Sequence, residues 1–210
     1  MMAAHNYKDL DSGSDTFSPA SYLINTIKRA ISNSQNIKID GGALGEIVVL
    51  SSEGEYFCSS GNLEELCKAN ASKFKITILD KSFRNHDTNY VGRNIDELMW
   101  TAGFYASEGR LMEGCYRDDV VEMVFWPNFT RLPSTPNSMR LAALLSSHPT
   151  SIALAHRFLR IEKEEAYQFY SAARCAGLVR AVNRAPEEPP LKPHRNQALL
   201  GLLLNKIARI

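Results

Sequence analysis

The stretch that most constrains the fold is residues 137–183, where apolar and small residues recur at helical spacing. Asn137 is a good N-terminal cap for a first helix. The apolar stripe of that helix consists of Leu141, Ala142, Leu144 and Leu145. This helix should end at His148, because the residue before a proline is disfavoured in the helical region. Thr150 or Ser151 can then cap a second helix.

The second and third helices of this stretch are separated by a tight turn at residues 159–161. The second helix has a short apolar face made of Ile152, Ala155 and Leu159. The third helix begins near Glu162, and its apolar stripe consists of Ala166, Phe169, Tyr170 and Ala173. Gly177 is a typical C-terminal cap, and residues 178–182 can then continue as a strand.

Three short helices followed by Ala-Gly-Leu-Val resemble the helix-turn-helix core of winged-helix domains. The resemblance covers roughly a quarter of the chain, and residues 1–136 suggest no family. It implies that the exposed face of the third helix binds the partner. That face would comprise Lys163, Glu164, Tyr167, Gln168, Ser171 and Arg174, with Arg180 and Arg184 in the wing. Residues 185–190 are rich in proline and glutamate where a second wing strand belongs, so we expect a truncated wing.

The residues before this stretch alternate between helix and strand patterns. Helices are predicted at residues 19–32, 63–68 and 95–108, and strands at residues 46–50, 56–58, 74–79 and 120–125. Residues 41–45 are rich in glycine but lack the Lys-Ser/Thr of a phosphate-binding loop, so they predict a turn. The mixed order of helices and strands predicts an α+β fold.

We therefore expect a small N-terminal mixed α/β domain, then a winged-helix-like three-helix domain and a C-terminal apolar helix. The expected parts are a flexible tail at residues 1–18, the α+β domain at 19–126, a packed strap at 127–136, the winged-helix-like domain at 137–184, a proline-rich linker at 185–193 and the terminal helix at 194–210. The strap should pack between the domains, because Trp126, Phe129 and Leu132 are too apolar to remain in water.

The terminal helix carries an excess of leucine and isoleucine, and its docking residues would be Leu199, Leu200, Leu203, Leu204 and Ile207. Three interpretations stay open. The helix folds back onto its own domain, docks into a partner or a second copy, or lies on a membrane surface. The membrane is the weakest of these, because Gly201 lowers the helix propensity and the apolar residues are poorly segregated.

The composition limits the classes of function. Its 44% hydrophobic and 22% charged residues are ordinary values for a soluble globular protein. The formal net charge of +1 produces no overall field toward nucleic acid or an anionic membrane. The N-terminus lacks a secretory signal, and no segment reaches the roughly 18 apolar residues of a membrane span. We therefore expect a cytoplasmic protein.

The sequence contains no familiar catalytic or metal-binding motif. Its cysteines form no C-x-x-C pair and have no histidine at ligand spacing, which predicts buried thiols at Cys58, Cys67, Cys115 and Cys175. Asp118 and Asp119 are adjacent and should be solvated. A polar loop could hold an anion through Arg84, His86, Asp87 and Arg93, although solvated side chains are more common there. We expect no cofactor and no small-molecule substrate, and an enzyme of an unfamiliar type is the remaining alternative.

Two kinds of binding protein fit these observations. The leading hypothesis is a non-enzymatic regulatory or adaptor protein that binds another protein through its third-helix face and its terminal helix. The alternative is a DNA-binding transcription regulator. Its base-reading residues would be Gln168, Ser171 and Arg174, and its phosphate contacts would be Arg180 and Arg184. Glu162, Glu164 and Glu165 at the start of the third helix would repel phosphate. They also suit the positive end of the helix dipole, which is the simpler explanation of their position.

Overall fold

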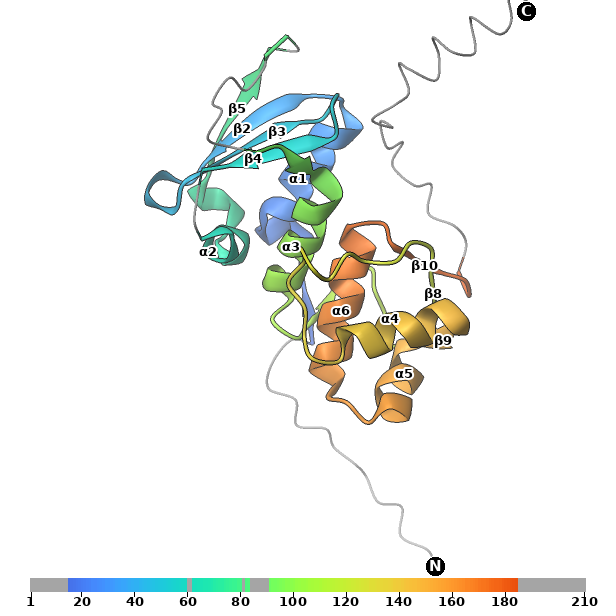
Figure 1. Ribbon diagram of the computed structural model, residues 1–210. Coiled ribbons are helices and arrows are strands. Elements are labelled where there is room, and N and C mark those ends of the chain that lie inside the picture. The colour runs from blue at the N-terminus through green and yellow to red at the C-terminus, as the bar shows by residue number, and fades with distance from the viewer. Residues whose placement is uncertain (1–14, 60–61, 81, 84–90, 185–210) are drawn as a thin grey trace, which may run out of the picture.

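A five-stranded antiparallel sheet forms one end of the molecule in the computed structural model, which describes residues 15–59, 62–80, 82–83 and 91–184 (Figure 1). The strand order is β5-β2-β3-β4-β6. The strands are β2 (Asn36–Asp40), β3 (Glu46–Leu50), β4 (Glu55–Cys58), β5 (Lys75–Leu79) and β6 (Arg93–Asn94). Helices and strands are mixed along the chain, which agrees with the predicted α+β class.

One face of this sheet is apolar and covered. Ile37, Ile39, Ile47 and Val49 point to this face and are buried. The helices α1 (Leu23–Ser32), α2 (Leu63–Lys68) and α3 (Ile95–Ser107) lie together on one side of the sheet (Figure 1). The opposite face is more polar and carries an ion pair between Lys38 and Glu46, with Nζ and Oε2 2.5 Å apart. This alternation is typical of a sheet with one face toward solvent.

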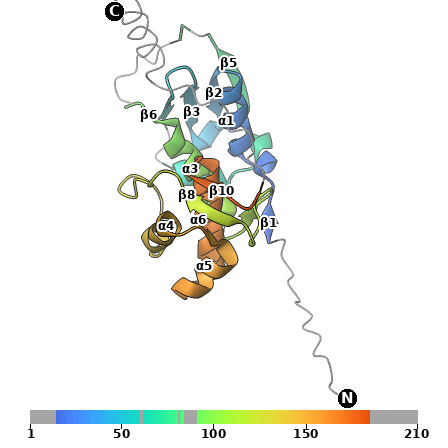
Figure 2. The same cartoon turned by 90° about the vertical axis from the view of Figure 1, so that its right-hand side faces the viewer.

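The helices α3 and α6 (Lys163–Cys175) pack side by side in the middle of the molecule, as both views show (Figures 1 and 2). A Cβ atom on Gly103 of α3 would lie 2.8 Å from the Cys175 Sγ and 3.0 Å from the Ala172 Cα, so the two helices approach as closely as they do because position 103 is glycine. The Trp100 ring meets the Phe169 ring edge-on at 5.6 Å. The buried residues of the N-terminal and C-terminal parts therefore form one continuous core.

The C-terminal part combines three helices with a second, smaller sheet. Its elements are β8 (Val120–Met123), α4 (Ser138–Ser147), β9 (Thr150–Ser151), α5 (Ile152–Leu159), α6 and β10 (Val179–Ala181). The strand order is β10-β8-β9, and both pairings are antiparallel. The sequence places residues 120–125 in the N-terminal domain, but β8 pairs with β9 and β10 of the C-terminal part. The strand propensity of residues 120–125 identifies the strand itself. It does not specify the pairing partners, which are β9 and β10.

The beginning of the described chain is ordered against the core. Strand β1 (Thr16–Phe17) pairs in parallel with β7 (Leu111–Met112), and Phe17 is buried. The predicted flexible tail is therefore wrong for its last residues, because Phe17 finds a buried site; residues 1–14 lie outside the described residues. Short 3-10 helices at Pro19–Ser21, Gly42–Leu44 and Ala71–Lys73 complete the elements of the described residues.

The predicted strap packs against Trp100 of α3. The Trp100 indole N–H donates to the Pro133 carbonyl at 2.9 Å, the Phe129 ring meets the indole edge-on at 6.0 Å, and Leu132 is buried. Packing is thus confirmed for Phe129 and Leu132. It is wrong for Trp126, which is 53% exposed and meets the Phe129 ring edge-on with ring centres 6.5 Å apart. The predicted linker at 185–193 and terminal helix at 194–210 lie outside the described residues.

Tyr56 of β4 is buried, and its hydroxyl has no hydrogen-bond partner among the described residues. An unsatisfied buried polar group costs about 1–3 kcal/mol. We therefore expect Tyr56→Phe to raise the free energy of unfolding by about 1 kcal/mol at neutral pH. Urea titration of both proteins measures this difference, and a clear loss of stability in the variant would contradict it.

The same substitution should also alter the response to alkali. Burial raises the pKa of Tyr56 to about 12. In the unfolded chain this tyrosine ionises near pH 10. The contribution of neutral Tyr56 to the free energy of unfolding is therefore fully present below about pH 10 and is lost as the pH rises toward 12. The Tyr56→Phe variant has no ionisable group at this position, so its stability does not fall in this way. Its gain in the free energy of unfolding over wild type should therefore grow between neutral pH and about pH 11.

Candidate functional site: an acidic groove at the start of α6

An open groove of about 470 Å³ lies between α2, α3 and the first turns of α6. Its lining consists of Glu64, Lys68, Phe104, Tyr105, Glu108, Gly109, Glu162, Glu164, Glu165 and Gln168. Five glutamates and one lysine line it, so the formal charge of the lining is −4. Phe104 and Tyr105 add an aromatic surface, with their rings edge-on at 5.5 Å. The groove thus joins negative charge to aromatic surface at the start of the third helix.

The carboxylates on α6 have a local reason for their position. Glu162 is the N-terminal cap residue, and Glu164 and Glu165 stand in the first turn. Negative side chains there interact favourably with the positive end of the helix dipole. Glu165 also accepts a hydrogen bond from the Asn137 side chain at 2.7 Å, which ties α6 to the start of α4.

The end of α3 closes against the same turn of α6. Glu108 has left-handed backbone geometry with φ of 47°, and Gly109 follows with φ of 85°. A Cβ atom on Gly109 would lie 2.9 Å from the Glu164 Cβ, so a side chain at position 109 would collide with α6. Because position 109 is glycine, the end of α3 can approach α6, and the carboxylates of Glu108 and Glu164 line the same groove.

The groove already holds one ammonium group of its own. The Lys68 Nζ donates to Glu64 at 2.5 Å and lies 5.8 Å from the centre of the Tyr105 ring. The hydrogen bond to Glu64 raises the pKa of Lys68 above its ordinary value. A carboxylate beside an aromatic face is a favourable environment for a cation. Lys68 is the single lysine of the lining, and four glutamates line the groove in addition to Glu64.

The structure separates the residues that we expected on the third-helix face. Glu164 is exposed and Gln168 is half-buried in the groove lining, with Lys163 beside them. Tyr167 and Ser171 are buried, so their predicted exposure is wrong. Ser171 Oγ accepts from the Met112 N–H at 3.0 Å. The physical reason is that α3 and β7 cover this side of α6.

The predicted phosphate contacts are engaged within the protein. Arg180 pairs with Glu122 on the neighbouring strand, with Nη2 and Oε2 2.8 Å apart. Arg184 pairs with Asp119, donates to the Gly114 carbonyl at 3.0 Å and lies 4.1 Å from the centre of the Tyr116 ring. Arg174 is half-buried near the end of α6. These arginines therefore do not form one exposed basic surface with the groove.

Asp119 is a structural residue that our reading of the sequence missed. Its carboxylate is 2% exposed, so the predicted solvation of this residue is wrong. It accepts hydrogen bonds from the Tyr170 hydroxyl at 2.7 Å and the Tyr116 N–H at 2.8 Å, as well as from Arg184. Asp118 next to it is 80% exposed in its side chain, as expected. The sequence contains no signal that distinguishes the two, because the side chains that bond to Asp119, Tyr170 and Arg184, are remote in sequence.

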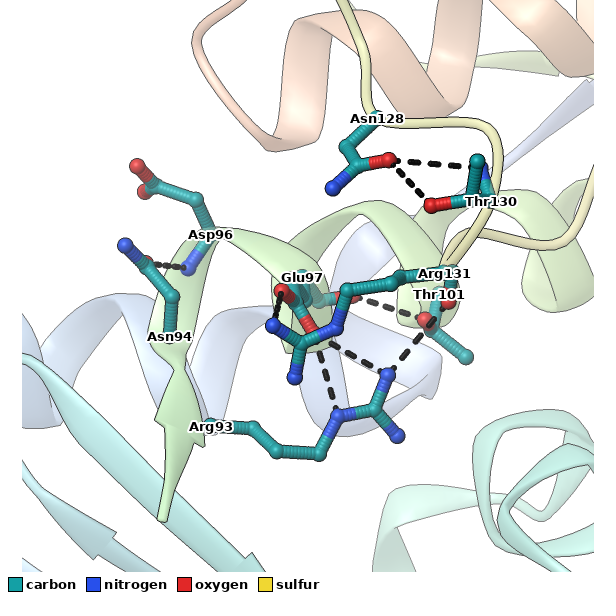
Figure 3. Close-up of polar contacts among 8 residues, drawn as sticks. All are labelled: Arg93, Asn94, Asp96, Glu97, Thr101, Asn128, Thr130 and Arg131. Carbon is teal, nitrogen blue, oxygen red and sulfur yellow. Dashed lines mark hydrogen bonds and ion pairs between the residues drawn. The ribbon is translucent and has the colours of Figure 1, made fainter.

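A second charged cluster fastens α3 to the strap (Figure 3). Glu97, whose side chain is 14% exposed, lies 3.0 Å from Arg93 Nη2 and 3.3 Å from Arg131 Nη1. Arg93 also donates to the Arg131 carbonyl at 3.3 Å. The Glu97 carboxylate pairs with both guanidinium groups, so this cluster joins elements within the protein. Of the anion site considered above, only Arg93 lies within the described residues.

The described residues contain no group of three or more histidine, cysteine, aspartate or glutamate side chains that could hold a metal ion. All four cysteines are free thiols, and burial raises the pKa of Cys115 to about 12 and of Cys175 to about 11. Such thiols are poor nucleophiles. Among the described helices, none is long and apolar enough to cross a membrane.

Comparison with protein families, with curated proteins and with solved structures found no match for this chain. The proposed function therefore rests on the groove and its surroundings. The predicted docking residues Leu199, Leu200, Leu203, Leu204 and Ile207 lie outside the described residues.

Proposed function

We propose that this chain is a non-enzymatic regulatory or adaptor protein of the cytoplasm that binds a basic segment of another protein. The binding site is the acidic groove between α2, α3 and the start of α6. The observation that carries the proposal is the groove lining, in which five glutamates and two aromatic rings surround a single lysine. The terminal helix at 194–210 would add a second contact.

The arrangement of the C-terminal part supports a winged-helix-like module. Its order α4, β9, α5, α6 and β10 places a short strand between the first two helices and another after the third. The small sheet then lies beside the helices, with β8 between β9 and β10. In this module the third helix uses its first turn, rather than its length, to meet a partner.

The chemistry of the groove favours lysine or arginine side chains as the ligand. Carboxylates accept charge-assisted hydrogen bonds from these groups, and arginine can use two at once. Phe104 and Tyr105 offer aromatic surface to the aliphatic stems and to the cation. The Lys68 contact with Glu64 and Tyr105 shows the same combination inside the protein.

The DNA-binding alternative has less support. Of its three base-reading residues, Ser171 is buried and Gln168 donates to the Phe104 carbonyl at 3.0 Å. The exposed start of that helix is the acidic groove, which phosphate would avoid. Reading a base pair with this helix would require α3 to separate from α6.

The proposal is tested by fluorescence anisotropy with a labelled peptide that alternates arginine with serine and glycine. The matched ligand has glutamine in place of each arginine. We expect salt-sensitive binding of the arginine peptide alone. The double variant Glu162→Lys, Glu164→Lys should bind it at least about tenfold more weakly, which corresponds to about 1.4 kcal/mol.

The control variant is Asp118→Lys, which changes an exposed carboxylate outside the groove and should leave the affinity unchanged. A mixed-sequence DNA duplex is measured at low salt in parallel. Equal binding of the arginine and glutamine peptides would refute the groove as a cation site. Salt-sensitive binding of the duplex would instead support the DNA-binding alternative.

A further inference from the structure

The larger sheet ends in a strand whose apolar side chains are exposed. Strand β5 is at the edge of the strand order, and among the described elements it pairs only with β2. Ile76 is 41% and Ile78 is 66% exposed. These two residues stand on the covered face of the sheet, because Ile76 is opposite Ile39 and Ile78 is opposite Ile37. The apolar face of the sheet thus continues beyond the buried residues of β2.

The two edges of this sheet differ in a way that bears on assembly. Strand β6 at one edge has two residues and leads directly into α3. Strand β5 at the other edge has five residues and pairs with β2 in an unbroken register. Exposed edges are commonly protected by proline, by bulges or by several charges. Strand β5 has no proline and no bulge, and its one charged residue is Lys75 at its beginning.

We propose that a second copy of this chain pairs with β5, so that the two edge strands meet antiparallel about a two-fold axis at Thr77. This register places Ile76 of each copy opposite Ile78 of the other and Thr77 opposite Thr77. Cross-strand pairs of β-branched residues stabilise a sheet. Lys75 lies opposite Leu79, so no like charges face each other. The two copies would form one continuous sheet with a shared apolar face.

The symmetry of this contact limits the assembly to a dimer. The same edge is used by both copies, so the interface is closed. The opposite edge, β6, is too short to recruit a third copy in the same manner. An interface of five residues on each side is small, so we expect an affinity in the micromolar range. The contact uses no residue of the acidic groove, and it stands independently of the proposed function.

Light scattering coupled to size-exclusion chromatography tests the proposal on the full chain, from about 5 to about 200 µM. The wild-type mass should rise toward that of a dimer across this range. Ile78→Lys should remain monomeric, because it places a charge opposite Ile76 of the second copy. The matched control is Phe158→Lys, which replaces a side chain on α5 that is 70% exposed and should still dimerise.

The register is tested by Thr77→Cys under mild oxidation with oxidised glutathione. Two thiolates then join across the axis as one disulfide, and the glutathione disulfide is reduced to two thiols. We expect a covalent dimer on non-reducing gels, whereas Lys75→Cys should give little. A wild-type protein that stays monomeric at all concentrations would overturn the proposal. So would dimerisation of Ile78→Lys at the wild-type affinity, since it would place the contact elsewhere.

Discussion

Replacing Trp100 with alanine should lower the free energy of unfolding by about 4 kcal/mol. The side chain is fully buried between the strap and α6, where it contacts Phe129 and Phe169. The substitution removes both ring contacts, leaves a large cavity and deprives the Pro133 carbonyl of its indole donor. Since the core is continuous, the loss should affect the whole described fold in one cooperative transition. Urea or thermal unfolding followed by circular dichroism measures it.

The chain offers a matched control in its other tryptophan. Trp126 is 53% exposed and meets Phe129 with ring centres 6.5 Å apart. Trp126→Ala should therefore change the stability by less than about 1 kcal/mol. Two separate transitions in Trp100→Ala, or equal losses in both variants, would contradict a single core organised around Trp100.

Asp119→Ala should cost about 3 kcal/mol of stability, toward the lower end of the range for breaking a buried ion pair. The substitution removes the acceptor of the Tyr170 hydroxyl and leaves Arg184 without its carboxylate. The Arg184 side chain is 29% exposed, so water can replace part of the lost interaction and moderate the cost. Chemical denaturation at neutral pH measures the change.

The neighbouring residue provides the control for this prediction. The Asp118 side chain is 80% exposed, and its carboxylate lies 3.7 Å from Arg117 Nε, whose side chain is 72% exposed. Exposed ion pairs contribute little to stability, so Asp118→Ala should lie within about 0.5 kcal/mol of wild type. A similar result for Asp119→Ala would show that the Asp119 interactions do not fasten β8 to α6.

The packing of α3 on α6 bears directly on the choice between the two functional hypotheses. A winged-helix protein that reads DNA needs an exposed third helix. Here the third helix is the centre of the protein, and its first turn provides most of its exposed charge. That turn and its cap residue carry three glutamates and Lys163, so the available surface is net negative and suits a cation better than a phosphate.

Several elements could be predicted from the sequence because their signals are local. Asn62, Asn94 and Ser151 cap α2, α3 and α5 with side-chain hydrogen bonds to backbone N–H groups, as their positions before apolar patterns indicate. The hairpin of β3 and β4 and the breaks at His148 and Gly177 follow from the same short-range rules. Each depends on residues within about one or two turns of one another.

Strand β2 shows where local signals fail. It was not predicted, because Ile37 and Ile39 alone give too short an alternation, yet it lies between β3 and β5 in the sheet. Strand β2 pairs with β3, which follows it after a short 3-10 turn, and with β5, which is remote in sequence. The same limitation explains why the sequence places residues 120–125 with the N-terminal part, although β8 pairs with β9 and β10.

The sequence by itself determined the α+β character, most helix boundaries and the carboxylates at the start of the third helix. Only the tertiary structure decided which side of that helix is available. The apolar pattern of α6 is compatible with one buried stripe, but Gly103 lets α3 approach Ala172 and Cys175 closely, Ser171 bonds to Met112 of β7, and Tyr167 is buried as well. Glu64 and Glu108 join Glu164 in one groove for the same reason, since residues distant in sequence become neighbours only when the helices pack.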